Sequence, residues 1–308
     1  MASSPAIAMQ RSLFPRERSC LGCGGHMKRV FVLPCHSVYR CDACTLYALR
    51  RETLEDTGGE LDREHVVPGL RALRERNYRT VLDVLRPWQG GRLLDVGCSA
   101  GLFLASAQAA GFRCHGIEPD PYFRCQAEGI VPGAVAAGHF PADLPSDWHS
   151  FDVITFHDVL EHLPDPIAAL SEAKRLLNPG GVIAVSLPVA DGFAFRLGCL
   201  LGRMGIRFAL QRLFQVGFPY PHWFYFSRQS LARVAPRAGL QVARTIPLAS
   251  FSWQGMWDRA RTHLVHPERA REWARLAAEG MGLLVLTALQ PWVEADNALV
   301  LLQPPAAG

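Results

Sequence analysis

Four cysteines near the amino terminus have the spacing of metal ligands. They form two Cys-x-x-Cys pairs with seventeen residues between the pairs: Cys20, Cys23, Cys41 and Cys44. Each pair places two thiolates on one tight turn, and two such turns can close a tetrahedral zinc site. A four-cysteine site has no open coordination position, so we expect structural zinc. A redox role for either pair is the alternative, and Cys35, His26 and His36 lie nearby as substitute ligands.

A glycine turn and a later acid have the layout of a nucleotide-type cofactor site. Residues 93–101 predict a buried strand and a tight turn, followed by a helix over 102–110. Small turn residues let the backbone approach a ligand, and the helix N-terminus offers free N–H groups. Glu118 lies twenty-one residues after Gly97, at the end of the next predicted strand, where its carboxylate can accept both ribose hydroxyls.

Two departures from common motifs narrow the choice of cofactor. A dinucleotide fingerprint would need glycine at positions 99 and 102, where this chain has Ser99 and Leu102. No Gly-Lys-Ser/Thr follows, which excludes a phosphate-binding P-loop.

The segment resembles motif I of the class I S-adenosylmethionine (SAM) methyltransferases, with Ser99 in place of the middle glycine. Residues 151–166 and 176–185 are similar to the fourth and fifth strands of that family and the segments around them. The resemblance covers about residues 92–188. It implies an α/β fold: a Rossmann-like seven-stranded methyltransferase core, here with a small N-terminal zinc ribbon and a helical cap insertion. Ubiquinone O-methyltransferase-like and sugar methyltransferase-like enzymes are the most similar branches.

The resemblance implies which residues would bind S-adenosyl-L-methionine. Asp95 and Gly97 would form the floor under the methionine moiety, and Glu118 would take the ribose. His139 and Phe140 would flank the adenine, although the Asp common at that place is absent. The expected cofactor-binding set is Asp95, Gly97, Cys98, Ser99, Gly101, Glu118, Pro119, His139, Phe140 and His157.

Three histidines are candidates for the base that takes a proton from a hydroxyl acceptor. His157 ends the fourth strand at the ligand-binding edge of the sheet, His162 follows Glu161, and His222 lies in the predicted cap. An imidazole suits the task because its pKa lies near working pH. Each of the three could instead be a hydrogen-bonded structural group. Glu161 or Asp158 could orient a catalytic histidine.

The sequence predicts four consecutive parts. These are a disordered tail (1–19), the zinc ribbon (20–49), a linker with a lead-in helix (50–91, helical over 69–85) and the SAM-binding domain (92–308). Within the last part we expect an acceptor cap at about 189–226 and a helical insertion at about 250–295. Pro-Gly-Gly at 179–181 should stop a helix, and a final strand at 298–302 should pair antiparallel beside the sixth. The apolar run 281–288 predicts a buried helix rather than a membrane anchor.

The segment 192–257 has eight arginines and thirteen aromatic residues but no Asp or Glu. Arg196, Arg203, Arg207 and Arg212 lie within a stretch that could form a basic amphipathic surface. We expect this cap to capture an acceptor with an anionic group, such as a nucleotide-sugar, a lipid-linked phosphate or an aromatic acid. The alternative is a cap whose arginines only cover apolar surface.

Composition limits the remaining choices. The chain has 308 residues, 49% of them apolar, and a net charge of only +4, which does not indicate bulk nucleic-acid binding. The metal-type cysteines indicate a reducing compartment, so we expect a cytoplasmic protein, with peripheral membrane contact as a variant of that expectation. The expected function is O-methylation of a small, lipid-linked or nucleotide-linked acceptor. C-methylation of an activated keto-sugar and a non-catalytic SAM-binding protein with a zinc-ribbon docking module are the alternatives.

Overall fold

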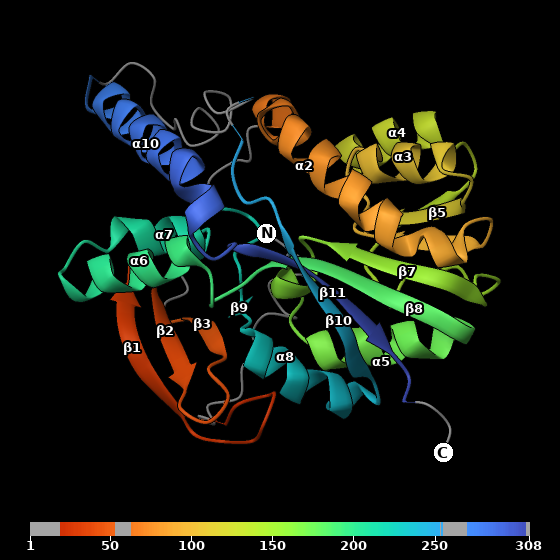
Figure 1. Cartoon of the computed structure of the whole chain (residues 1–308), viewed down its shortest axis with the longest axis horizontal. Coiled ribbons are helices and arrows are strands. Elements are labelled where there is room, and N and C mark those ends of the chain that lie inside the picture. The colour runs from red at the N-terminus through yellow and green to blue at the C-terminus, as the bar shows by residue number, and fades with distance from the viewer. Residues whose placement is uncertain (1–18, 53–62, 253, 255–269, 306–308) are drawn as a thin grey trace, which may run out of the picture.

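The larger of two sheets forms the centre of the molecule. The computed structural model describes residues 19–52, 63–252, 254 and 270–305. The sheet has seven strands in the order β10-β11-β8-β7-β4-β5-β6 (Figure 1). Its strands are β4 Arg92–Val96, β5 Arg113–Glu118, β6 Val135–Ala137, β7 Phe151–His157, β8 Leu177–Pro188, β10 Gln241–Leu248 and β11 Asn297–Gln303. The predicted α/β fold class is confirmed.

The central strands are buried on both faces. In β7, Val153 belongs to one apolar cluster, whereas Ile154 and Phe156 belong to another, because side chains point to opposite faces of a sheet. One face is covered by α2 (Arg63–Leu85), α3 (Leu102–Ala109) and α4 (Pro121–Ile130), and the other by α5 (Pro166–Leu176) and α8 (Arg228–Val234) (Figure 1).

The strand directions bring several loops to one edge. β4, β5, β6, β7 and β8 pair in parallel, so their carboxyl ends meet at the same edge, where ligands bind in such sheets. β11 runs antiparallel between β8 and β10. The antiparallel final strand beside the sixth is therefore confirmed.

A second sheet combines the amino-terminal segment with a piece of the cap. It has the order β1-β2-β3-β9, with β1 Met27–Leu33, β2 His36–Cys41, β3 Tyr47–Arg51 and β9 Phe224–Tyr225. β9 pairs antiparallel with β3, with Tyr47 opposite Tyr225. The sequence did not predict this pairing, because a strand of two residues is too short to show an alternating pattern.

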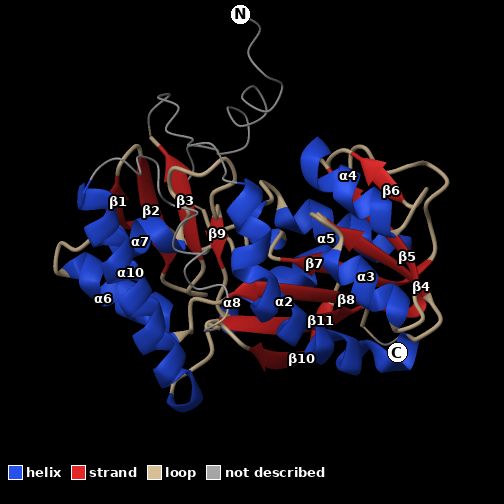
Figure 2. Cartoon of the chain, turned by 90° about the horizontal axis from the view of Figure 1, so that it is seen from above, coloured by secondary structure: helices blue, strands red, loops and turns tan. Residues whose placement is uncertain are grey.

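The remaining helices gather beside this second sheet. α6 (Phe193–Arg203) and α7 (Phe208–Leu213) follow β8, and α10 (Ala270–Leu289) precedes β11. Seen from above, the small sheet, α6, α7 and α10 form one end of the molecule, and β4 to β6 with α3 and α4 form the other (Figure 2). Four short 3-10 turns complete the description: η1 Arg86–Trp88, η2 Leu160–His162, η3 Ala235–Ala238 and η4 Gln290–Trp292.

The end of α5 differs from the prediction. The helix ends at Leu176, and β8 begins at Leu177, before the Pro-Gly-Gly sequence. Asn178 Nδ2 donates to Asp152 Oδ1 at 2.8 Å, which holds this early part of β8 beside β7. The register between the two strands is irregular between Phe151 and Val153. The Pro-Gly-Gly sequence therefore lies in an irregular strand start rather than at the helix end.

The prediction of a buried helix over 281–288 is wrong. These residues are helical, but Met281 is 61% exposed and Val285 is 51% exposed. Their spacing places them on one face of α10, and that face borders a large cavity instead of a packed core.

One predicted segment falls largely, and a second partly, outside the described residues. The predicted tail 1–19 overlaps them only at Ser19, whose backbone bridges to His26. Of the predicted linker, residues 53–62 are not described. β3 extends the small sheet to Arg51, two residues past the predicted end of the ribbon.

Candidate active site and cysteine cluster

The loop after β4 is tightly packed and has no room for side chains at its glycines. Gly97 has φ +68°, and a Cβ there would lie 2.7 Å from Val159 Cγ2. Gly101, the N-cap of α3, has φ +77°, and a Cβ there would meet the backbone of Ala127 at 2.9 Å. Ser99 adopts φ +49°, a left-handed conformation that glycine would adopt at less cost. The loop therefore has the conformation expected of methyltransferase motif I, and Ser99 holds it at the cost of backbone strain.

Glu118 connects this loop to the start of α4. Its Oε2 accepts from the Ser99 N–H at 2.8 Å, and its Oε1 accepts from the Asp120 N–H at 2.9 Å. Burial raises the pKa of Glu118, and the two N–H donors oppose that rise. Each carboxylate oxygen has a second lone pair. Glu118 can therefore accept hydrogen bonds from two vicinal hydroxyls while it holds the loop.

Three predicted cofactor residues do not line the cavity beside the loop. Asp95, Cys98 and Gly101 are not among the described residues that line the cavity. Asp95 is buried and accepts from Thr155 Oγ1 at 2.7 Å. Burial raises the pKa of Asp95 to about 7. In this arrangement Asp95 braces β4 against β7 and does not face a ligand.

The other predicted cofactor residues line one cavity of about 1880 Å³ at the carboxyl edge of the sheet. They are Gly97, Ser99, Glu118, Pro119, His139, Phe140 and His157. An acid that the sequence analysis missed, Asp143, also lines this wall, and its Oδ2 accepts from the His139 N–H at 2.8 Å. The signal was a carboxylate four residues after His139, displaced from the position where the family pattern places it.

His157 lies on the cofactor side of the cavity and is enclosed by aromatic rings. Its ring centroid is 4.2 Å from that of Phe103 and 5.3 Å from that of Tyr78. Its Nδ1 lies 2.9 Å from Ser186 Oγ. Burial lowers the pKa of His157 to about 3. Such a low pKa makes this imidazole a weak proton acceptor.

His162 and His222, the other two histidines, meet across the cavity wall. Their ring centroids are 4.6 Å apart, although they are sixty residues apart in the chain. His222 Nε2 lies 4.0 Å from Glu161 Oε1. Glu161, His162 and His222 offer ligand atoms within 4.8 Å of one another, so this cluster could also hold a cation.

Burial sets the protonation of this cluster. Burial raises the pKa of Glu161 well above its usual value, with Asp158 adding to the rise. Burial lowers the pKa of both His162 and His222. Neither oxygen of Glu161 has a hydrogen-bond partner within the described part of the chain. Burial therefore favours the uncharged form of all three side chains.

The tautomer of His162 follows from its contact with the cap. His162 Nδ1 lies 3.0 Å from the Pro221 carbonyl oxygen. A carbonyl oxygen only accepts, so Nδ1 carries the proton and Nε2 keeps its lone pair. The residue after Pro221 is His222, so the cap both fixes this tautomer and supplies the second histidine.

Apolar side chains of three helices form the rest of the cavity wall. Leu197 and Leu201 of α6, Phe208 of α7, and Val285 and Leu289 of α10 all line it. On the opposite side, α2 contributes Arg74 and Tyr78, which the sequence analysis treated only as part of a lead-in helix. Arg74 Nη2 lies 3.9 Å from Asp158 Oδ2. The part of the wall that α6, α7 and α10 form is thus largely apolar.

The four arginines of the predicted basic stretch do not form one surface. Arg196 pairs with Glu294 at 3.0 Å. Arg212 lines the cavity. Arg203 and Arg207 are exposed on the outside, beside β1. Only Arg212 is therefore placed to meet a ligand inside the cavity.

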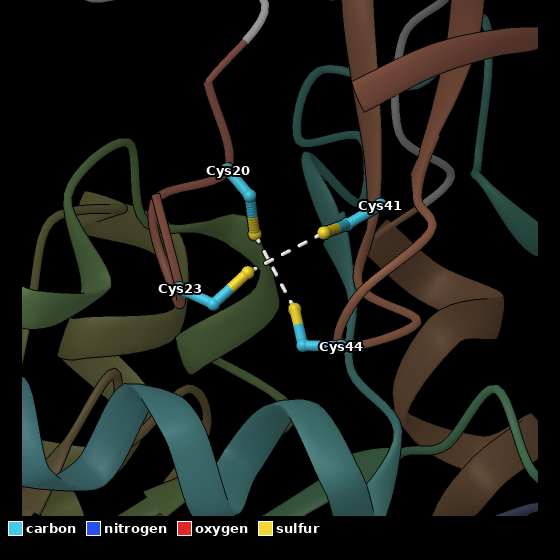
Figure 3. Close-up of side chains that lie close together, drawn as sticks. All are labelled: Cys20, Cys23, Cys41 and Cys44. Atoms are coloured by element: carbon cyan, nitrogen blue, oxygen red, sulfur yellow. Dashed lines mark hydrogen bonds between the residues drawn. The ribbon is translucent and has the colours of Figure 1, made fainter. Parts of the chain in front are cut away.

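The predicted zinc ligands converge on one point. Cys20 Sγ lies 3.4 Å from Cys44 Sγ, and Cys23 Sγ lies 3.5 Å from Cys41 Sγ; the two contacts cross in Figure 3. All four sulfur atoms lie within 4.8 Å of one another, and none of the four cysteines forms a disulfide. Zinc–sulfur bonds of about 2.3 Å place tetrahedral sulfur atoms about 3.8 Å apart. The cluster therefore fits a four-coordinate metal ion.

Similarity to known proteins identifies the family of this chain. The methyltransferase domain family matches residues 70–245, more than half of the chain. Ubiquinone biosynthesis O-methyltransferase of Thiobacillus denitrificans is 27% identical over 168 residues, which are 52% of this chain and 68% of that protein. The tRNA U34 carboxymethyltransferase of Azotobacter vinelandii is 31% identical over 192 residues, which are 60% of this chain and 52% of that protein. The chain spans about half to two thirds of the length of these relatives.

Solved structures share the fold. A SAM-dependent methyltransferase from Thiobacillus denitrificans in complex with S-adenosyl-L-homocysteine superposes with a TM-score of 0.51 at 16% identity, covering 80% of this chain and 100% of that one. A methyltransferase in complex with the Haloferax volcanii Trm112 methyltransferase activator has a TM-score of 0.51 at 17% identity, covering 81% and 99%. The chain therefore belongs to the methyltransferase domain family and is a class I SAM-dependent methyltransferase.

Proposed function

We propose that this enzyme methylates an oxygen atom of an acceptor that has an apolar body and an anionic group. The observation that carries the proposal is His162, with its tautomer fixed by the Pro221 carbonyl, in the same cavity as the Gly97 loop and Glu118. A hydroxyl acceptor must lose its proton as it attacks the methyl group, and a neutral imidazole can take that proton. SAM supplies the methyl group from its sulfonium.

His222 and Glu161 support the imidazole that becomes protonated. When His162 takes the proton of the acceptor, the Glu161 carboxyl group lies close enough to stabilise the new positive charge through its dipole, because both groups share a low-dielectric pocket. His222 packs against His162 and is held by its backbone N–H, which donates to the Phe214 carbonyl at 3.0 Å. We assign His162 as the base and His222 as a positioning residue. The low pKa of His157 argues against that residue as the base.

The cavity walls favour a particular acceptor. Side chains of α6, α7 and α10 offer an apolar surface for a ring or chain, and Arg212 adds one cation inside the cavity. An arginine fork suits a carboxylate or a phosphate. A lipid-linked or aromatic acceptor fits this wall better than a bare nucleotide. The name of the ubiquinone relatives agrees with O-methylation of such a compound.

C-methylation of an activated keto-sugar remains the second candidate. The buried Glu161–His162 pair could remove a proton from carbon as well as from oxygen, and the zinc ribbon occurs in that branch too. The apolar cavity wall counts against a sugar, because a sugar needs many hydrogen-bonding partners.

We also propose that Cys20, Cys23, Cys41 and Cys44 hold one structural zinc ion. The fit rests on the converging sulfur atoms in Figure 3. Four protein ligands leave no place for a substrate, so the metal would hold the ribbon in shape and take no part in methyl transfer. Metal analysis of protein purified without chelator should find one zinc per chain, and a Cys41→Ser variant should lose it.

Methyl transfer to a panel of phenols and catechols with alkyl chains, with and without a carboxylate, tests the acceptor proposal. Labelled SAM reports the transfer. His162→Ala should lower kcat about 10²- to 10⁴-fold and leave SAM affinity within about twofold. Since burial lowers the pKa of His162, the acid limb of kcat/KM should lie below pH 6.5. Product methylated on carbon, or transfer only to tRNA, would contradict the proposal.

Arg212 gives a matched test of the anionic group. Arg212→Gln should raise KM about tenfold for carboxylated acceptors and leave KM for the uncharged analogues nearly unchanged. Arg203→Gln, outside the cavity, is the control and should change neither value. Equal effects of the two substitutions would show that the arginines act only through the general field of the segment.

A further inference from the structure

A surface that mixes arginines with exposed apolar side chains lies where the ribbon meets the cap. We call it the ribbon–cap patch, and its residues are Arg29, Val30 and Val32 of β1 together with Leu200, Arg203, Met204, Ile206 and Arg207 around the α6–α7 turn. The two segments are in direct contact, because a Cβ at Gly202 would lie 3.2 Å from the Phe31 ring. In Figure 1, β1 and α6 lie at the same end of the molecule.

The apolar members of the patch are unusually exposed. Met204 is 69% exposed, Leu200 is 53% exposed and Val32 is 47% exposed. Single exposed apolar residues are common on protein surfaces, but a cluster of them indicates a binding surface. β1 is also the edge strand of its sheet, so Val30 and Val32 stand at a free border of the molecule.

The charged members of the patch are all positive. Arg29, Arg203 and Arg207 line a hollow of about 350 Å³, and no acidic residue is among the described residues that line it. Within the described part of the chain, none of these three arginines forms an ion pair, whereas the nearby Arg196 does. Arginine binds phosphate groups well, and three of them around one hollow favour an anionic partner.

The patch adjoins the mouth of the acceptor cavity. Ile206 is 50% exposed and also lines the cavity, so it belongs to both surfaces. On the α10 side, Met281 and Val285 are likewise both exposed and cavity-lining. Ile206 therefore joins the patch to the cavity that His162 also lines.

We propose that the ribbon–cap patch docks on an anionic phospholipid surface. Arginines would contact the lipid phosphates, and Leu200, Met204 and the valines would enter the interface, as in other surface-bound proteins. A two-fold dimer through the patch would bring its own arginines together, which disfavours a second copy as the occupant. Only the further step, entry of a lipidic acceptor past Ile206, rests on the proposed function. Docking itself requires no turnover.

Vesicle binding in the absence of acceptor and SAM tests the proposal. We expect the full chain to bind vesicles of phosphatidylcholine with phosphatidylglycerol, and to bind pure phosphatidylcholine vesicles far more weakly. Arg203→Glu with Arg207→Glu should lower the partition coefficient about 25-fold or more, because each basic residue near an anionic surface contributes about fivefold. Leu200→Ser with Met204→Ser should lower it about tenfold.

A double variant with the same charge change is the control. Arg233→Glu with Arg244→Glu alters exposed arginines of α8 and β10, away from the patch, and should lower binding less than about threefold. SAM affinity and zinc content of each variant show whether the core and the ribbon remain folded.

Four results would overturn the proposal. They are no vesicle binding by wild type, equal binding of wild type to both kinds of vesicle, an equal loss in the control variant, and a dimer in light scattering that the patch substitutions dissociate. Vesicle binding without methyl transfer to any acceptor would refute the proposed function and leave docking intact. Transfer to soluble acceptors without vesicle binding would do the reverse.

Discussion

The two ends of the cavity are built in different ways. The cofactor end uses the loops after β4, β5 and β6, which come from about fifty consecutive residues. The acceptor end joins η2, the cap and α10, which are far apart in the sequence, and the ribbon braces it from behind. The first end holds its shape through hydrogen bonds between neighbouring loops, such as the one from the Ser99 N–H to the Glu118 carboxylate. The second end depends on contacts between remote segments, so it can lose its shape separately.

The ribbon is the clearest case of such a contact. Its second cysteine knuckle contacts the N-cap of α8, directly after the cap, because Ser227 Oγ donates to the Cys44 carbonyl at 3.2 Å. One strand further, the Leu49 N–H donates to the Trp223 carbonyl at 2.8 Å. Trp223 follows His222, so the segment that carries this histidine is fastened to the ribbon. A metal in the cysteine cluster would therefore stabilise the acceptor end from outside the cavity.

Removal of the metal should give the largest difference between the two ends, with the acceptor end losing structure and the cofactor end keeping it. Chelation should unfold the ribbon, because structural zinc contributes much of the folding free energy of such a module. Hydrogen exchange should then rise over 20–51 and over β9, while β4 and β5 stay protected. SAM affinity should change less than about threefold. Equal loss of protection at both ends, or none at either, would remove the difference between them.

Gly97→Ala should damage the cofactor end alone. The added methyl group would have to share space with Val159, and alanine is disfavoured at φ +68°. We expect SAM affinity to fall about 10²- to 10³-fold, as measured by calorimetry, with zinc content unchanged. Gly133→Ala is the control, since it has φ +74° but nothing within 4 Å of the new methyl group. Its SAM affinity should stay within about twofold.

The same difference decides what the sequence could predict. The Gly97 turn and the position of Glu118 could be predicted, because each depends on neighbours within one βα unit, and the seven-stranded fold followed from the family resemblance. The strand β9 was not, because its pairing with β3 joins residues 47–48 to 224–225. The contact between His162 and His222 could not be predicted from their spacing either, although both were named as candidate bases. The apolar run in α10 was read as core, since periodicity does not distinguish a packed core from a cavity wall.

Glu118→Ala should have a smaller effect at the same end. The substitution strands the N–H groups of Ser99 and Asp120 and would remove the proposed acceptor for two ribose hydroxyls. We expect SAM affinity to fall about 5- to 150-fold, which corresponds to about 1–3 kcal/mol. Glu128→Ala is the control: it removes a half-buried carboxylate of α4 that accepts from the Gly133 N–H and does not line the cavity, and it should leave SAM affinity unchanged. Unchanged affinity in Glu118→Ala would exclude this residue from the cofactor site.

Asp95→Asn should have the smallest effect on SAM binding and should act on the stability of the fold instead. Burial raises the pKa of Asp95 to about 7 in the folded protein, above its ordinary 3.8, so the native state holds a proton that the unfolded chain releases. The stability that this carboxyl group contributes is fully present below pH 3.8 and is lost as the pH rises to about 7. At pH 8 the loss amounts to at most about 4 kcal/mol. Asparagine can still accept from Thr155 and has no charge to bury.

The melting temperature of Asp95→Asn, measured without SAM, should therefore exceed that of wild type by an amount that grows from pH 5 to about pH 7 and then levels off. Asp83→Asn, which alters an exposed carboxylate on α2, should show no such trend. A difference that shrinks with rising pH would mean that Asp95 is stabilised as the anion. In that case Asp95 would belong to the cofactor site, although it does not line the cavity.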